Sequence, residues 1–82
     1  MDLVSLTEFI VKNLVKNPEK LEINISEDAD VKIIQILVDS SDIGSIIGKG
    51  GNIANAIRTI IQASSYHNKL GRVRVNIDVL NN

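Results

Sequence analysis

The chain has 82 residues, 44% of them apolar, and a formal net charge of −1. A chain this short folds around one core, and its apolar content argues against intrinsic disorder. It contains no cysteine and a single histidine, which excludes disulfides, thiol catalysis, cysteine-based zinc sites and histidine-rich metal clusters.

The N-terminal segment predicts a helix. Apolar residues recur at helical spacing over residues 3–16, and Pro18 ends the pattern because proline disfavours helical geometry in the residue before it. Asp2 is the predicted cap, although Ser5 and Glu8 have the spacing of a capping box one turn later. The start of this helix is therefore open by one turn.

Two strands are predicted next. Residues 21–26 alternate between apolar and polar types, which indicates a strand with one wet face, and residues 27–30 form a polar turn. Residues 31–38 are nearly continuous in apolar side chains, as expected of a central strand covered on both sides or nearly so. This strand presents two apolar faces, formed by Ile34, Ile36 and Val38 and by Ile33 and Leu37.

Two helices separated by glycines follow. A short helix is predicted to run to Ile47, with Ser41 or Asp42 as its cap. Asn52 is the predicted cap of a second helix that runs to about Ser64. The isoleucines of this second helix form a predicted buried stripe: Ile53, Ile57, Ile60 and Ile61.

A polar loop over residues 65–71 precedes a last alternating strand over residues 73–79. The predicted order is helix, strand, strand, helix, helix, strand. Three strands with helices packed on one face make a small α/β protein of the α+β sandwich type.

The sequence GKGG at residues 48–51 turns the chain sharply between the two helices. A nucleotide-hydrolase phosphate loop needs four residues between its glycines and a hydroxyl after its lysine, whereas here three residues separate the glycines and Lys49 precedes a glycine. The dinucleotide fingerprint fails because Ile53 stands where its third glycine belongs. The remaining reading is a close approach of a sugar-phosphate backbone to a helix N-terminus, with Lys49 as a mobile cation.

Charge is unevenly placed along the chain. Residues 19–42 hold seven of the ten acids, whereas residues 43–77 hold five Lys and Arg and no acid. Such one-sided charge attracts a polyanion even when the net charge is near zero, although ordinary surface charge is the alternative. No apolar run approaches the roughly 20 residues of a membrane span, and the start carries acids and no basic leader, so a cytoplasmic protein is expected.

The sequence IIGKGGNI, residues 46–53, resembles the signature of the KH domain, with isoleucines in phase on both sides of G-x-x-G. The element order resembles the type II, prokaryotic arrangement, and the resemblance covers essentially the whole chain. It implies one KH domain over residues 1–82, in which residues 1–30 are an N-terminal extension and residues 31–80 the core motif. It also implies a three-stranded mixed sheet with three helices on one face.

KH domains clamp about four nucleotides of single-stranded RNA at the G-x-x-G loop. The resemblance implies this RNA-binding set: Gly48, Lys49, Gly50 and Gly51 in the clamp, Ile43, Gly44 and Ser45 along the base groove, and Asn52 and Arg58 on the second helix. For Gly44 the alternative is a tight helix crossing, and for Arg58 it is a solvated charge.

The loop after the second helix forms one rim of the groove in the family. It holds Tyr66, His67 and Lys69 here. Tyr66 either stacks on a base or packs over the edge of the core, and no role is assigned to His67. Arg72 and Arg74 alternate opposite to the valines of the last strand, so they are expected to point away from the groove.

The resemblance implies a single-stranded RNA-binding protein without catalytic residues, cofactor or metal. Its implied role is post-transcriptional regulation or RNA chaperoning linked to cell elongation and division. It further implies a homodimer, or a heterodimer with a larger RNA-binding protein that carries a KH domain. With one lysine in the clamp, the isolated domain is expected to bind weakly with a shallow salt dependence.

Two rival functions belong to other classes. The first is a KH-fold protein-interaction module that acts mainly in dimerisation or assembly, for which the open sheet side with Ile33 and Leu37 would serve. The intact GKGG loop favours RNA binding over this alternative. The second is a nucleotide-binding enzyme, which would need the magnesium ligand that the loop lacks.

Overall fold

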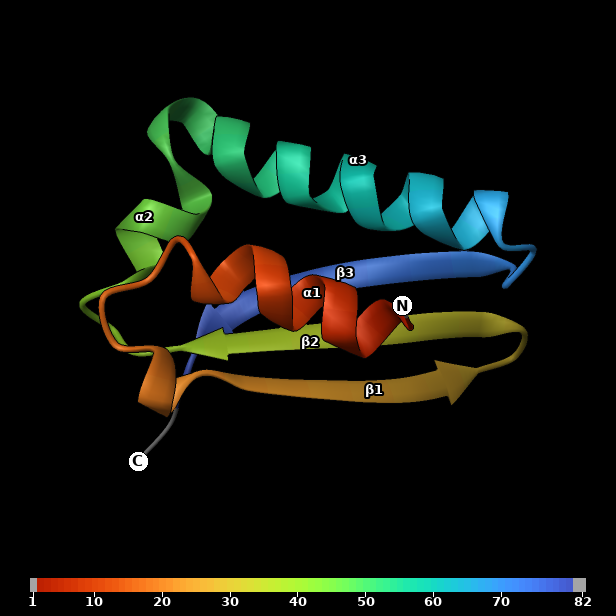
Figure 1. The fold of residues 1–82 in the computed structure, drawn as a ribbon, viewed down its shortest axis with the longest axis horizontal. Helices are drawn as coiled ribbons and strands as arrows, with labels where there is room; N and C mark the ends of the chain where they lie inside the picture. The colour runs from red at the N-terminus through yellow and green to blue at the C-terminus, as the bar shows by residue number, and fades with distance from the viewer. Residues whose placement is uncertain (1, 81–82) are drawn as a thin grey trace.

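The computed structural model describes residues 2–80 and has two layers, a sheet and a set of helices that cover one face of it (Figure 1). The strands are β1 (Glu22–Asp28), β2 (Val31–Val38) and β3 (Arg72–Val79). The helices are α1 (Leu3–Lys12), α2 (Ile43–Ile47) and α3 (Asn52–His67), with short 3₁₀ turns η1 (Pro18–Lys20) and η2 (Lys49–Gly51). The sheet order is β1-β2-β3, with β1 antiparallel and β3 parallel to β2. The predicted α+β sandwich with a mixed sheet is therefore confirmed.

The core lies between the sheet and the helices. Its buried apolar residues are Leu3, Val11, Ile34, Ile36, Val38, Ile46, Ile57, Ile61, Val73 and Val75. The inner face of β2 is thus the predicted one. The expectation that β2 is covered on both faces or nearly so is wrong, because the helices pack on one face, Ile33 and Leu37 are half-buried, and Gln35 is exposed.

Helix α1 begins at the earlier of the two predicted starts, since Asp2 accepts a hydrogen bond from the Ser5 N–H at 2.7 Å. It ends at Lys12, four residues before the predicted end. The N–H groups of Lys16 and Asn17, which a longer helix would pair internally, donate instead to the Asp42 carboxylate. A long-range contact therefore ends the helix before Pro18 is reached.

The buried side of α1 is formed by Leu3, Thr7 and Val11. Thr7 fits there because its hydroxyl donates to the Leu3 carbonyl at 2.7 Å, which satisfies a buried polar group. The predicted helix pattern counted only apolar residues, so it did not anticipate that Thr7 is buried.

Helix α3 begins at Asn52, and Gly51 occupies the cap position, so the prediction that Asn52 caps this helix is wrong. The helix continues to His67, past the predicted end at Ser64, which shortens the loop before β3. Of the predicted stripe, Ile57 and Ile61 are buried, but Ile60 is 48% exposed. Small side chains complete the buried side in its place: Ala54 and Ser65.

No helix within residues 2–80 is long and apolar enough to cross a membrane.

Candidate nucleic-acid interface

The GKGG loop is a tight turn whose three glycines have positive φ, of 74° at Gly48, 64° at Gly50 and 80° at Gly51. Gly48 is also sterically required, because an added Cβ would lie 2.6 Å from Cγ1 of Ile53. A Cβ at Gly50 or Gly51 would meet nothing within 4 Å. The loop is therefore closed toward the core at its first glycine and open to a ligand at the other two.

The N-terminus of α3 emerges directly from this loop. Its cap residue, Gly51, makes no side-chain hydrogen bond to the helix, so the first-turn N–H groups are not blocked by a capping side chain. Asn52 is the first helical residue and is exposed, as is Lys49 in the preceding turn. The positive end of a 16-residue helix and one mobile cation thus lie at the same surface, although the Asn52 N–H already donates to the Lys49 carbonyl.

Helix α2 forms the other side of the loop. Gly44 and Ser45 are exposed, and a Cβ at Gly44 would meet nothing within 4 Å, which rules out the tight helix crossing considered for this glycine. Ile43 is half-buried and packs against the core. The two exposed residues leave a smooth, accessible surface on α2 for a flat ligand.

Arg58 is neither free in solvent nor part of the core. Its Nε donates to the carbonyl of Val75 at 3.3 Å, and its Nη1 donates to Oδ1 of Asn55 at 3.2 Å. The guanidinium is therefore held across the space between α3 and the outer edge of β3. Arg58 is half-buried and lies beside the strand that borders this space.

Gln62 lies one turn further along α3 and was missed by the sequence reasoning. Its Nε2 donates to the carbonyl of Val73 at 3.5 Å, at the long limit for a hydrogen bond. The four-residue spacing from Arg58 is the signal that could have identified it, because residues four apart share a helix face.

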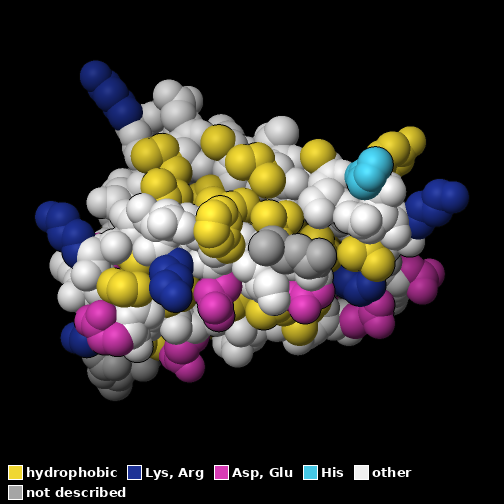
Figure 2. Space-filling view, viewed as in Figure 1, with side chains coloured by type: hydrophobic (Ala, Val, Ile, Leu, Met, Phe, Trp, Pro, Cys, Tyr) yellow, Lys and Arg dark blue, Asp and Glu magenta, His cyan; other side chains and the backbone are white. Residues whose placement is uncertain are grey.

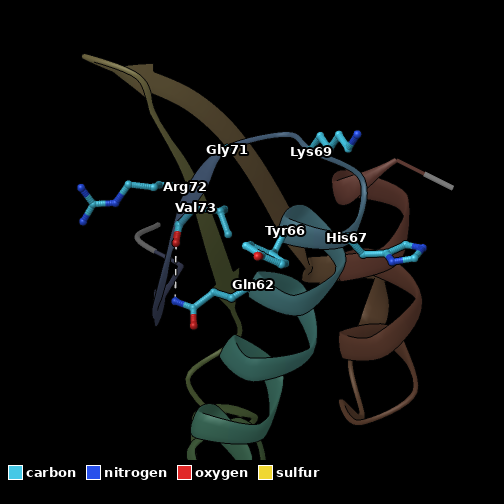
Figure 3. A pocket seen from close by; sticks show the side chains of 7 residues that line it. All are labelled: Gln62, Tyr66, His67, Lys69, Gly71, Arg72 and Val73. Carbon is cyan, nitrogen blue, oxygen red and sulfur yellow. Dashed lines mark hydrogen bonds between the residues drawn. The ribbon is translucent and has the colours of Figure 1, made fainter.

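The far end of α3 brings Tyr66, His67 and Lys69 together with the start of β3. Tyr66 is 86% exposed, so the alternative in which it packs over the core edge is wrong. These residues line an open hollow, together with Arg72 (Figure 3). The Arg72 side chain projects away from α3 in this view, yet Arg72 is among the residues that line the hollow; Arg74 is exposed.

Asp42 precedes α2, at the opposite end of that helix from the GKGG loop, and is fully buried. Its carboxylate accepts hydrogen bonds from the N–H of Lys16 at 2.9 Å, and from the N–H and Nδ2 of Asn17 at 3.0 and 3.2 Å. The hydrogen bond from the Lys16 N–H is the main cause that holds the pKa of this carboxyl below its usual value. Asp42 occupies the N-cap position of α2, one of the two predicted positions, but its side chain makes no capping hydrogen bond there. It ties the start of α2 to the segment after α1 instead.

Acidic side chains are unevenly distributed over the surface. Figure 2 shows them along the side of the molecule that holds β1, with Lys or Arg side chains among them, while at the corner where α2 meets α3 a Lys or Arg side chain projects without an acidic neighbour. Since acids would repel a polyanion, the α2–α3 corner is electrostatically the more favourable place for one.

Comparisons with known proteins agree with this geometry. A family model described as KhpA/KhpB, KH domain, matches residues 4–77. The chain is 40% identical over 77 residues to a Borreliella burgdorferi protein named RNA-binding protein KhpA. This match covers 94% of this chain and 90% of that protein. It is 38% identical over 76 residues to a protein of the same name from Oceanobacillus iheyensis, covering 93% and 97%. A third protein of that name, from Aquifex aeolicus, is 36% identical over 78 residues, covering 95% of each chain.

Proposed function

Because the chain belongs to the KhpA/KhpB KH-domain family, we propose that it binds single-stranded RNA and holds about four nucleotides at the loop between α2 and α3. The observation that carries this proposal is the loop itself, which combines left-handed glycines, an α3 N-terminus without a capping side chain, and an exposed lysine.

Each part of the site has a proposed role. The backbone of Gly48, Gly50 and Gly51 allows the sugar-phosphate chain to approach, and the α3 N-terminus with Asn52 and Lys49 contacts phosphate. The bases lie over Ile43, Gly44 and Ser45, where the missing Cβ of Gly44 leaves room for a flat ring. Arg58 offers its remaining guanidinium N–H groups to a base or a phosphate.

The proposed biological role is RNA binding without catalysis, in the cytoplasm, in post-transcriptional regulation or RNA chaperoning linked to cell elongation and division. One lysine in the clamp gives weak binding with a shallow salt dependence. A second RNA-binding domain would raise the affinity through avidity. We therefore propose that the chain works as a homodimer or as a heterodimer with a larger KH-containing RNA-binding protein.

The test replaces Lys49 and Gly50 together, as Lys49→Asp with Gly50→Asp. Gly50 has open space around it, and aspartate tolerates positive φ better than most residues, so the variant is expected to fold. Fluorescence anisotropy with a pool of short single-stranded RNAs, at low and physiological salt, should show binding at least about ten-fold weaker than wild type. Circular dichroism checks the fold.

A matched control separates the loop from net charge. Lys12→Asp with Ser5→Asp makes the same change in net charge on exposed positions of α1. It should retain most of the RNA affinity. An equal loss of RNA affinity in both variants would mean that only the net charge matters. Equal RNA affinity of the wild type and the loop variant would show that the loop is not the clamp. Self-association of a wild type that binds no RNA would favour the protein-interaction module instead.

A further inference from the structure

The two edges of the sheet are finished differently. The order β1-β2-β3 makes β1 and β3 the edge strands, and an edge strand turns about half of its backbone N–H and C=O groups away from the sheet. On the outer edge of β3, the carbonyls of Val75 and Val73 accept hydrogen bonds from the side chains of Arg58 and Gln62. The backbone of β1 receives no such bond from any side chain within residues 2–80.

The helices also leave most of β1 uncovered. Of its seven residues only Ile23 is half-buried, and the other six are exposed. Ile25 lies on the same side of the strand as Ile23, the side that faces the helices, yet it is 47% exposed. Figure 1 shows the reason, since the β1–β2 hairpin extends past the start of α1. Strand β1 therefore keeps an open edge and an uncovered apolar side chain.

A small hollow of about 220 Å³ lies beside Ile25, between the start of α1, the β1–β2 hairpin and the end of the loop before β3. Its lining is mainly aliphatic, and Leu70 within it is itself 39% exposed. The lining residues are Asp2, Leu3, Val4, Ile25, Lys32 and Leu70. An aliphatic side chain from outside the molecule would bury apolar surface there.

The carboxylates of β1 form no ion pair within the chain. Glu22 and Asp28 lie on the open side of the sheet, one at each end of the strand, and Glu27 lies on the helix side. Between residues 2 and 80, the one salt bridge joins Lys20 to Asp39. The strand thus offers three unneutralised carboxylates to a neighbouring chain.

These charges decide which kind of chain suits the edge. If a second copy paired its β1 antiparallel about Ile25, Glu22 of one copy would lie opposite Asp28 of the other, and like charges directly opposite destabilise a strand pair. The same carboxylates repel nucleic acid. A strand with Lys or Arg on alternate residues is complementary instead, because these side chains would all lie on one side of it.

We propose that the outer edge of β1 binds an extended, basic segment of another protein, which adds a fourth strand to the sheet. Backbone hydrogen bonds to β1 hold the segment, as in other cases of strand addition. Its basic side chains lie on the open side near Glu22 and Asp28, and an aliphatic side chain on the helix side packs on Ile25 at the small hollow. This inference does not rest on the proposed RNA-binding function.

The probe is a seven-residue peptide, blocked at both ends, in which lysine and valine alternate, because β1 also has seven residues. It is titrated into isotope-labelled protein, and the backbone amide signals are followed by NMR. The amides of residues 22–28 should shift most, and hydrogen exchange should slow at those that point outward. Absence of binding, or shifts spread over acidic residues of other elements, would overturn the inference.

Backbone methylation tests whether the peptide pairs as a strand. Only alternate residues of a strand direct their N–H groups to a given neighbour. One peptide is therefore N-methylated at its valines and a second at its lysines. Their affinities should differ by at least about ten-fold, because only one of the two sets faces β1. Equal affinities would mean that charge attraction alone holds the peptide, and the strand-addition proposal would fail.

Charge reversal tests the specificity of the edge. Glu22→Lys with Asp28→Lys should bind the lysine peptide at least about five-fold more weakly and should bind a peptide with glutamate in place of lysine more tightly than wild type does. The matched control, Glu8→Lys with Glu19→Lys, makes the same change in net charge at exposed positions outside the sheet and should keep the wild-type affinity.

All four substituted side chains are exposed, so both double variants are expected to fold, which circular dichroism checks. An equal loss of peptide affinity in the two double variants would show that net charge, and not the β1 edge, determines binding. The comparison of the two methylated peptides uses wild-type protein, so it decides the proposal even if a variant does not fold.

Discussion

The two ends of α3 are both tight turns, yet they are built in opposite ways. At its N-terminus, glycines supply the conformation and no side chain caps the helix. At its C-terminus, side chains close the backbone, because Asn68 Nδ2 donates to the Ser64 carbonyl and Ser65 Oγ to the Gly71 carbonyl, both at 2.8 Å. The first end is therefore closed by glycine conformation, whereas the second is closed by side-chain hydrogen bonds.

The two ends also differ in what anchors them. The N-terminal end rests on α2, which the buried carboxylate of Asp42 ties to the segment after α1. The C-terminal end relies on Ser65, a buried neutral hydroxyl. A charged anchor depends on pH and a neutral one does not, so the two ends should respond differently to acid.

The largest expected effect is the loss of the Asp42 anchor. Asp42→Asn keeps the shape but places an NH₂ group where a carboxylate oxygen accepts from backbone N–H groups, so buried donors lose a partner. The variant should unfold at markedly lower urea concentration than wild type. Slowed or unchanged amide exchange in α2 and the loop, with exchange raised only at the far end of α3, would contradict the assigned role.

The same anchor predicts an acid dependence. The folded-state pKa of Asp42 lies below its usual value, chiefly because the Lys16 N–H favours the carboxylate, so its stabilisation is present above about pH 4 and is lost as pH falls through the folded pKa. The Ser5 N–H and the Ser41 hydroxyl similarly lower the pKa values of Asp2 and Asp39. The unfolding free energy of Asp42→Asn should therefore fall less steeply with acid than that of wild type.

A smaller loss of stability is expected from substituting the glycines at the two ends of α3, and it should differ between them. Gly48→Ala should destabilise the fold by about 2–4 kcal/mol, because the residue has positive φ and its Cβ would collide with Ile53. Gly71→Ala has the same φ problem, but its Cβ would lie 3.9 Å from the Asp30 carbonyl, an ordinary contact, so about 1–2 kcal/mol is expected. Urea unfolding measures both free energies of unfolding. Equal losses in the two variants would show that the collision with Ile53 adds nothing to the cost of positive φ.

The smallest effect on stability is expected on α2. Gly44→Ala should stabilise the fold by up to about 1 kcal/mol, because Gly44 lies in a helix and its Cβ would enter open space. The same methyl would crowd the proposed base groove and weaken RNA binding. Thermal unfolding together with anisotropy tests the pair of effects, and unchanged RNA affinity would place the bases elsewhere.

Much of the fold was predictable because it follows from local pattern. The alternating and continuous apolar runs placed β2 and β3 nearly correctly, since a strand's side-chain period is a property of the backbone. The GKGG signature and the element order were sufficient to indicate the family. The glycines of this signature are visible in the sequence because the positive φ angles of the turn favour glycine. Residue type and position gave Asp2 as one of two possible helix starts, and the structure selects it.

What the sequence could not determine depends on residues distant along the chain. Helix α1 ends early because the carboxylate of Asp42, 26 residues after Lys16, accepts a hydrogen bond from the Lys16 N–H. Thr7 and Ser65 are buried because each hydroxyl finds a carbonyl, whereas Ile60 is exposed because it lies off the side of α3 that meets the sheet. The position of Arg58 and Gln62 beside β3, and the hollow at Tyr66, exist only once α3 is packed along that strand, because hydrogen bonds between separate elements require their tertiary placement.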